Sequence, residues 1–213
     1  MKTISIRNQP INYFNNDGHF KQVESNKWEP ETFDVLDQYI KPGKTFLDIG
    51  AWIGTLSIYA AKLGANVISI EPDVQARKWL LDNLEANDCV NTVLNCAVSN
   101  KRGTAKLSNP NQFGDSMSSL VHGNDNYVEV ETIPLSDLLG DNICLIKIDI
   151  EGGEYDVFNS KTLIDLVQVN CPPILLSVHP AWIKNYGHFI ENLEEYKSYY
   201  EMETIAHDLI LLK

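Results

Sequence analysis

The sequence predicts an α/β fold of the doubly wound class, in which helices cover both faces of a mostly parallel sheet. From residue 45 to residue 178, short apolar runs of strand length alternate with helical segments. Nearly continuous apolar strands are typical of parallel sheets that are buried on both faces. Residues 202–212 add two further candidate strands around His207-Asp208, which brings the expected sheet to seven strands.

Residues 1–28 are set apart by short pieces that alternate apolar and polar residues. Asn15-Asn-Asp-Gly18 is a turn signal between two candidate strands, so we expect a small β hairpin or lid there. A single domain is expected to follow over residues 29–213. It begins with a helix that has Pro30 at its first position and ends at Pro42-Gly43.

The strands of the main domain are expected at residues 45–49, 66–70, 93–98, 143–150 and 174–178. A helix over residues 55–63 stops at Gly64, and Asp73 can cap the next helix. The inward side of that second helix is expected to hold Val74, Leu80, Leu81 and Leu84. A further helix of mixed polarity is expected over residues 182–200, and the turn-rich residues 100–135 are expected to form a hairpin insertion over one edge of the sheet.

Composition narrows the class of protein. The chain has 213 residues, a net charge of -12 and a pI of about 4.7. This balance argues against a broad nucleic-acid or anionic-membrane surface, which would need a basic face. There is no apolar run of membrane-spanning length and no signal-peptide pattern at the N-terminus, so a cytoplasmic protein is expected. The four cysteines lack metal or disulfide spacing and are expected to be reduced.

The strongest motif is Phe46-Leu-Asp-Ile-Gly50-Ala-Trp-Ile-Gly54, a strand that enters a helix through a glycine turn. Gly50 lets the backbone turn sharply, and Gly54 would let the helix start close to a bound molecule. Free N–H groups of the turn could face a polar ligand group, and Asp48 adds an acceptor nearby. The fingerprint GxGxxG and the phosphate loop are both absent, which disfavours a nicotinamide or ATP site.

A second motif, Glu71-Pro72-Asp73, ends the next strand about twenty residues downstream of the glycine turn. A carboxylate in this place can accept hydrogen bonds from both ribose hydroxyls of an adenosine. The alternative is that Glu71 and Asp73 only stabilise the start of the following helix.

The stretch KIDIEGGE, residues 147–154, ends a buried strand with a lysine and three carboxylates. Lys147 and Asp149 share one face of the strand, about 6–7 Å apart. Ligands of such sheets bind beyond the C-terminal ends of the strands, which is where these carboxylates lie. The stretch is therefore expected to belong to the functional site.

Together these motifs resemble those of class I S-adenosylmethionine (SAM)-dependent methyltransferases, and in particular the FkbM family. The matching phrases, in chain order, are WEPETF, FLDIGAWIG, ISIEPD, NCAVS, SMSSL, LIKIDIEGGE and LLSVHP, within residues 28–180. The family usually has Asn where this chain has Trp52, so the contacts of that position are expected to differ. The resemblance implies a Rossmann-like sheet whose seventh strand is antiparallel.

The resemblance also implies a set of residues that bind SAM, with Glu29 and Glu31 facing its amino group and a backbone role for Cys96-Ala97 beside the adenine. An ordinary acidic helix start is the alternative for Glu29. The complete expected set is Glu29, Asp48, Gly50, Ala51, Trp52, Gly54, Glu71, Pro72, Cys96, Ala97 and Asp149.

For catalysis, an acceptor hydroxyl must lose its proton as it receives the methyl group, and a carboxylate can take that proton. Asp149 is the first candidate and Glu154 the second. Alternatively, Asp149, Glu154 and His179 could bind a divalent metal such as Mg²⁺, or His179 could be an ordinary polar residue at a strand end. Lys147 is expected to pair with Asp149 and orient the site, although a catalytic role stays open.

The expected function is SAM-dependent O-methylation of a small molecule or sugar, without a nucleic-acid or membrane partner, and with a homodimer left open. Two alternatives come from other classes of protein. One is a non-catalytic module that binds SAM or a nucleotide, and the other is a nicotinamide-dependent oxidoreductase.

Overall fold

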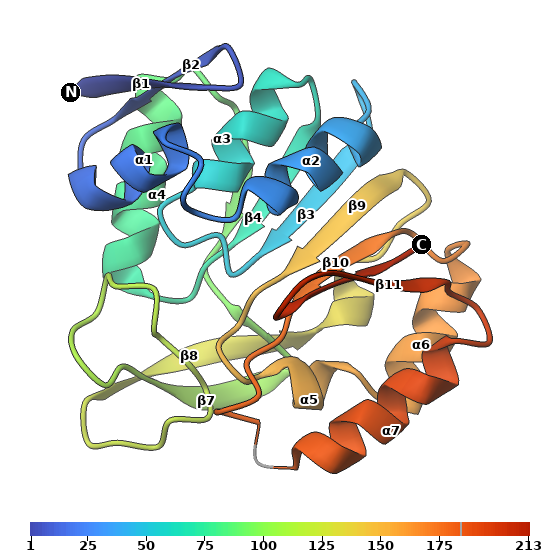
Figure 1. The fold of residues 1–213 in the computed structure, drawn as a ribbon. Coiled ribbons are helices and arrows are strands. Elements are labelled where there is room, and N and C mark those ends of the chain that lie inside the picture. The colour runs from blue at the N-terminus through green and yellow to red at the C-terminus, as the bar shows by residue number, and fades with distance from the viewer. Residues whose placement is uncertain (184) are drawn as a thin grey trace.

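The computed structural model describes residues 1–183 and 185–213. Its main sheet has seven strands in the order β11-β12-β10-β9-β3-β4-β5 (Figure 1). The strands from β5 to β10 in this order are parallel, whereas β12 is antiparallel to both of its neighbours. The predicted doubly wound class is confirmed, and the antiparallel last strand lies inside the sheet rather than at its edge. The strands are β3 (Thr45–Ile49), β4 (Asn66–Ile70), β5 (Thr92–Leu94), β9 (Ile143–Ile148), β10 (Ile174–Ser177), β11 (Met202–Ala206) and β12 (Leu209–Leu212).

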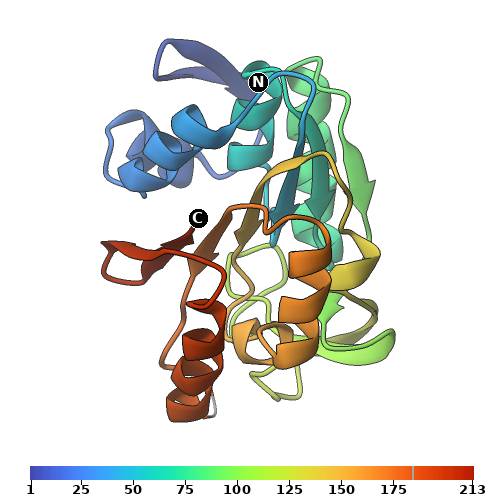
Figure 2. The same ribbon diagram turned by 90° about the vertical axis from the view of Figure 1, so that its right-hand side faces the viewer.

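Helices cover both faces of this sheet, as Figures 1 and 2 show. One layer consists of α2 (Pro30–Tyr39), α3 (Thr55–Lys62) and α4 (Val74–Ala86), and the other of α5 (Glu154–Val157), α6 (Ser160–Gln168) and α7 (Tyr186–Tyr196). Alternate residues of β3 feed the two layers, since Phe46 belongs to the first apolar cluster and Leu47 to the second. Each cluster contains apolar residues of the strands and of the helices on the same face, so the sheet is buried on both sides.

The N-terminal unit differs from its expected form. It consists of β1 (Lys2–Ile6), β2 (Gln9–Tyr13) and a helix, α1 (Asp17–Glu24). The hairpin turn lies at Arg7-Asn8, where two successive residues have positive φ, 47° and 69°, as a tight two-residue hairpin turn requires. Asn15-Asn-Asp-Gly18 instead leads into α1, so the prediction of a second strand after it was wrong.

The expected inward side of α4 was partly wrong. Leu80 and Leu84 are buried, but Val74 is 62% exposed and Leu81 is 49% exposed. Asn83 is buried instead, because its side chain accepts from the Phe14 amide at 3.0 Å and donates to the Ile53 carbonyl at 3.0 Å. The N-terminal unit packs on this helix, and its backbone amide at Phe14 needs a polar partner there. A pattern of apolar residues does not reveal that a buried position of the helix must be polar.

The strand expected at residues 93–98 is interrupted. β5 ends at Leu94, and the following β6 (Ala97–Ser99) leaves the main sheet to pair with β8 (Tyr127–Pro134). β7 (Gly103–Ser108) completes this separate three-stranded sheet, and a 3₁₀ helix at Leu135–Asp137 follows. The predicted insertion at residues 100–135 is therefore present, with β6 added to it.

Two glycines of the cofactor motif have positive φ, +83° at Gly50 and +88° at Gly54. A Cβ atom on Gly50 would lie 1.8 Å from the Asp149 carbonyl oxygen, and one on Gly54 would lie 2.4 Å from Leu80 Cδ1. Both glycines thus permit close packing of the protein against itself. At Gly54 the missing Cβ atom makes room for Leu80, and the expected approach of its backbone to a ligand stays a prediction.

Within the described residues, no helix combines the length and the apolar character needed to cross a membrane. Cys89, Cys96, Cys144 and Cys171 are free thiols, as expected, with Cys96 buried and the other three half-buried.

Replacement of Gly50 by alanine should destabilise the fold by about 3 kcal/mol or more, because it combines a disfavoured positive φ with a backbone clash. Chemical denaturation of Gly50→Ala measures this loss. Gly140→Ala is the matched control, since nothing lies within 4 Å of the added methyl group, and its change should stay within about 0.5 kcal/mol. Equal stabilities of the two variants would contradict the packing role of Gly50.

Candidate active site

A cavity of about 520 Å³ lies at the C-terminal ends of β3, β4 and β9, within the size range of small-molecule sites. It brings together almost every residue that the sequence predicted for the site. The exceptions are Gly54 and Glu154. The predicted residues that line the cavity are Glu29, Asp48, Gly50, Ala51, Trp52, Glu71, Pro72, Cys96, Ala97, Lys147, Asp149 and His179.

Part of the cavity wall comes from the N-terminal unit. The His19 ring makes edge contacts with Trp28 and Trp52, at centroid distances of 4.6 and 4.7 Å, and all three line the cavity. His19 Nε2 also bonds to Thr55 Oγ1 at 2.9 Å. Burial lowers the pKa of His19 to about 4, so this wall is uncharged at neutral pH.

Glu71 lies at the end of β4 and is 6% exposed. Its Oε2 accepts from the Trp52 amide and its Oε1 from the Asp73 amide, both at 2.8 Å. Burial raises the pKa of Glu71 to about 7, although these backbone donors oppose the shift. Each carboxylate oxygen has a second lone pair, so the predicted bonds to ribose hydroxyls stay compatible with this geometry.

The glycine turn itself does not offer the free amides that the sequence suggested. The amides of Gly50 and Ala51 donate to the Ile70 carbonyl at 3.0 and 3.1 Å, and that of Trp52 donates to Glu71. These bonds fix the turn against the end of β4. The amides of residues 50–52 are therefore already used within the protein and are not available to a ligand.

A loop between β7 and β8 is attached to the same motif. The Trp52 indole Nε1–H donates to the Gly114 carbonyl at 2.9 Å, which is the distinctive contact of this position. Asp73 Oδ2 accepts from the Gly114 amide at 2.8 Å and from Ser118 Oγ at 2.6 Å. Asp73 Oδ1 meanwhile caps α4, as predicted, by accepting from the Gln75 and Ala76 amides.

Asp48 lies under the glycine turn and is 2% exposed. It accepts from Ser57 Oγ at 2.5 Å, and Ser57 is in turn 2.7 Å from Ser69 Oγ. Burial raises the pKa of Asp48 to about 6, partly offset by the bond from Ser57. Its carboxylate thus serves a buried hydrogen-bond network as well as the cavity floor.

Lys147 is 1% exposed, and its Nζ donates to Asp149 Oδ2 at 3.2 Å and to Ser177 Oγ. Burial alone would lower the pKa of Lys147, but the charges of Asp149 and Glu29 outweigh it and raise that pKa. Burial would likewise raise the pKa of Asp149, yet the charges of Lys147 and His179 lower it. The predicted pairing of Lys147 with Asp149 is therefore present.

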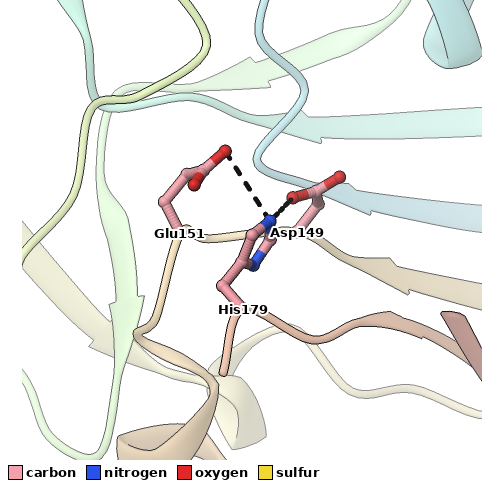
Figure 3. Close-up of side chains that lie close together, drawn as sticks. All are labelled: Asp149, Glu151 and His179. Atoms are coloured by element: carbon pink, nitrogen blue, oxygen red, sulfur yellow. Dashed lines mark ion pairs between the residues drawn. The ribbon is translucent and has the colours of Figure 1, made fainter. Parts of the chain in front are cut away.

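His179 follows β10 and faces two carboxylates. Its Nε2 lies 3.5 Å from Asp149 Oδ1 and 3.7 Å from Glu151 Oε1 (Figure 3). Its Nδ1–H donates to Glu154 Oε1 at 2.9 Å. Burial would lower the pKa of His179, but the bond to Glu154 and the nearby negative charges raise it to about 9.

The structure therefore corrects the expected role of Glu154. Glu154 is fully buried behind His179, and its contact is with Nδ1, away from the two carboxylates that face Nε2. Glu151 occupies the position beside Asp149 and His179 instead. Sequence reasoning missed it because Glu151 has a positive φ of 52°, which breaks the strand alternation by which side chains were assigned to faces. The glycine pair directly after it was the available signal of such a turn.

Glu151 is held from the opposite side by the insertion. Ser119 Oγ donates to the Glu151 carbonyl at 2.6 Å. Burial raises the pKa of the Glu151 carboxyl to about 7, although the charge of His179 opposes the shift. The cluster of Asp149, Glu151 and His179 thus consists of ionisable groups whose pKa values are shifted by burial and by one another, which is common at functional sites.

A doubly wound sheet with an antiparallel last strand, combined with a cavity between a glycine turn and an acidic strand end, defines the class of SAM-dependent methyltransferases. Comparison with known proteins agrees. The family model described as the methyltransferase FkbM domain matches residues 48–200. The chain belongs to this family.

Similar curated proteins include the ribosomal protein L11 methyltransferase of Campylobacter concisus, which is 28% identical over 155 residues. That match covers 72% of this chain and 51% of the relative. The corresponding enzyme of Macrococcus caseolyticus is 38% identical over 60 residues, or 28% of this chain and 19% of the relative. The chain thus spans about half or less of the length of these relatives.

Similar solved structures include a precorrin-6y C5,15-methyltransferase from Geobacter metallireducens, with a TM-score of 0.51 and 16% identity over 87% of this chain and 86% of that one. A TehB-like SAM-dependent methyltransferase from Corynebacterium glutamicum gives a TM-score of 0.50 and 12% identity over 92% and 91% of the two chains. At these identities the likeness shows the fold alone.

Replacement of Glu71 by alanine should weaken the binding of S-adenosylhomocysteine by about 10–100-fold, the scale for losing a partner of buried hydroxyls. Titration calorimetry of Glu71→Ala measures the change, with a denaturation curve to confirm folding. Glu131→Ala removes an exposed carboxylate that does not line the cavity, and it should bind as the unaltered protein does. Unchanged affinity in Glu71→Ala would remove Glu71 from the cofactor site.

The raised pKa of Asp48 predicts a defined pH dependence. Its carboxyl keeps its proton up to about pH 6 in the folded protein but ionises near pH 3.8 when unfolded. The unfolded state is therefore favoured increasingly as the pH rises through this window, by up to about 3 kcal/mol. From pH 4 to pH 6, Asp48→Asn should gain about 1–3 kcal/mol of stability relative to the unaltered protein. Urea denaturation tests this, with the exposed Asp125→Asn as control. A difference that does not change with pH would contradict the assignment.

Proposed function

We propose that this protein is a SAM-dependent O-methyltransferase that methylates a hydroxyl group of a small molecule or sugar. The observation that carries the proposal is that one cavity contains both the cofactor motif and the cluster of Asp149, Glu151 and His179. Family membership supports the methyl donor, and the cluster supports an acceptor that must lose a proton.

The cavity fits the chemistry of SAM. Glu71 can accept from ribose hydroxyls, and Cys96-Ala97 lies on the wall where β5 and β6 separate, the predicted place of the adenine. Glu29 also lines the cavity, as Lys147 does, and burial raises the pKa of Glu29. A cationic amino group beside Glu29 would therefore offset the cost of burying the Glu29 carboxylate. SAM supplies a methyl group attached to a positively charged sulfur.

In the transfer, the acceptor oxygen forms a bond to the methyl carbon as the carbon–sulfur bond breaks and its electron pair stays on sulfur. The hydroxyl proton must leave at the same time. Asp149 was the first candidate to take it, but its lowered pKa makes it a weak proton acceptor and a good hydrogen-bond partner for orienting the hydroxyl. In the metal-free protein, Glu151 is better matched, since its pKa of about 7 lies near the working pH. The alternative is a divalent ion such as Mg²⁺ at the same side chains.

The walls of the cavity favour a small acceptor. His19 and Trp28 line it from the N-terminal segments, and Ser116, Ser118 and Leu120 line it from the insertion. Such a chamber can admit a sugar or an extended side chain. The net charge of -12 supports an acceptor other than nucleic acid. Because the curated relatives are named for a ribosomal protein, protein side chains belong in the acceptor screen.

The function is tested by incubating the protein with SAM and a panel of hydroxylated acceptors, with amines and peptides alongside, and measuring S-adenosylhomocysteine. Turnover with hydroxyl acceptors supports the proposal, whereas turnover with amines alone would overturn O-methylation. Binding of SAM without turnover on any acceptor would favour a non-catalytic module. Displacement of SAM by NAD would favour an oxidoreductase.

Asp149→Asn should reduce turnover by about 10–100-fold while S-adenosylhomocysteine still binds, because the acceptor hydroxyl loses a charged hydrogen-bond partner that orients it. Single-turnover rates and calorimetry measure the two effects separately. Since this variant also removes a charged partner of the buried Lys147, its folding is checked by thermal denaturation. Full turnover in a folded Asp149→Asn protein would exclude Asp149 from the mechanism.

A further inference from the structure

We infer that Asp149, Glu151 and His179 bind one divalent cation of the Mg²⁺ or Mn²⁺ type. Asp149 Oδ1 and Glu151 Oε1 lie 3.5 and 3.7 Å from His179 Nε2, and no two ligand atoms of the three residues are more than 4.8 Å apart. Around an ion with bonds of about 2.1 Å, neighbouring ligand atoms lie roughly 3.0–3.4 Å apart. Small side-chain movements would therefore close the three atoms on an ion.

The histidine is oriented as a metal ligand. Its Nδ1–H donates to Glu154 Oε1 at 2.9 Å, which leaves Nε2 directed at the two carboxylates (Figure 3). Metal-binding histidines are commonly oriented in this way, with the second ring nitrogen bonded to a carboxylate. Glu154 is fully buried, and its Oε2 has no hydrogen-bond partner in the described part of the chain, so one acceptor atom directly behind the histidine is unsatisfied.

The other contacts hold the two carboxylates in place. Asp149 Oδ2 accepts from Lys147, which leaves Oδ1 free to face His179. The Glu151 backbone is fixed by Ser119 through its carbonyl, at a residue of positive φ. The ligand atoms are thus arranged by neighbours that do not occupy the space between them.

The charge of the cavity also favours a cation. Six carboxylates line it, and the basic residues that face them among the described lining residues are Lys147, His19 and His179. The positive sulfur and the amino group of SAM would offset part of this charge, and a divalent ion would offset more. The six are Glu29, Asp48, Glu71, Asp115, Asp149 and Glu151.

The role of the ion rests on the proposed function. A divalent ion at this cluster would lower the pKa of an acceptor hydroxyl beside it, so that the proton leaves to water and Glu151 stays ionised. The rival arrangement is a protonated His179 that itself serves as the cation between the carboxylates. The two differ in whether the protein binds a metal ion at all.

The test is titration of the full-length protein with Mn²⁺ alone, in the absence of SAM and acceptor, followed by calorimetry and electron paramagnetic resonance. We expect one site, with at least tenfold weaker binding in Glu151→Gln and His179→Gln, and weaker binding in Glu154→Gln through lost orientation of the histidine. An imidazole nitrogen coupling in the spin-echo signal should be present in the unaltered protein and lost in His179→Gln. Glu191→Gln is the control, since it changes an exposed carboxylate paired with His188.

Absence of Mn²⁺ binding, or binding that Glu151→Gln and His179→Gln leave unchanged, would overturn the inference. S-adenosylhomocysteine is titrated in parallel with a chelator present. Cofactor binding without Mn²⁺ binding would refute the cation site and leave the proposed function standing. Mn²⁺ binding at the cluster without cofactor binding would support the site and refute the methyltransferase. Thermal denaturation of each variant identifies any that fail to fold, in which case Asp149→Asn serves as the replacement.

Discussion

The burial of one lysine sets the arrangement of the whole site. Lys147 is on a central strand of the sheet and almost inaccessible to water, so its ammonium group must be compensated from within the protein. Asp149 and Ser177, at the ends of adjacent parallel strands, supply that compensation. This requirement directs Asp149 into the cavity, where its other oxygen meets His179 from the end of β10. A stability constraint and a functional arrangement therefore depend on the same carboxylate.

The remaining charges follow a similar logic of shared partners. Glu71 accepts backbone bonds from the glycine turn and from the start of α4, and so connects the two elements on either side of the predicted cofactor position. His179 connects β10 to both Glu154 and the Asp149 side of the cluster. Because each group has several partners, the pKa shifts in this region arise from burial and charge acting together rather than from single pairs.

Much of the architecture could be predicted from the sequence, because it depends on local rules. The strands at residues 45–49 and 66–70, the cap by Asp73 and the final hairpin around His207-Asp208 follow from periodicity and turn chemistry. The failures depend on contacts between distant segments. Asn83 is buried because the N-terminal unit covers it, and a glycine is needed at position 54 because the Leu80 side chain packs directly against it. Glu151 replaces Glu154 in the cluster because one residue of positive φ redirects the chain, which a two-residue period cannot show. The cofactor roles expected of Glu29 and Cys96-Ala97 came from the family resemblance alone, because no local sequence pattern indicates them.

Asp73 has one oxygen on the start of α4 and the other on the Gly114–Ser118 segment. Formation of that helix and closure of this wall are therefore thermodynamically coupled, since neither can be lost without releasing a bond of the same carboxylate. Slow hydrogen exchange at the first turn of α4 and protection of the insertion from proteases should consequently rise and fall together. The wall is attached through a buried carboxylate to the start of a helix, which makes it a more permanent boundary than its position in a loop would suggest.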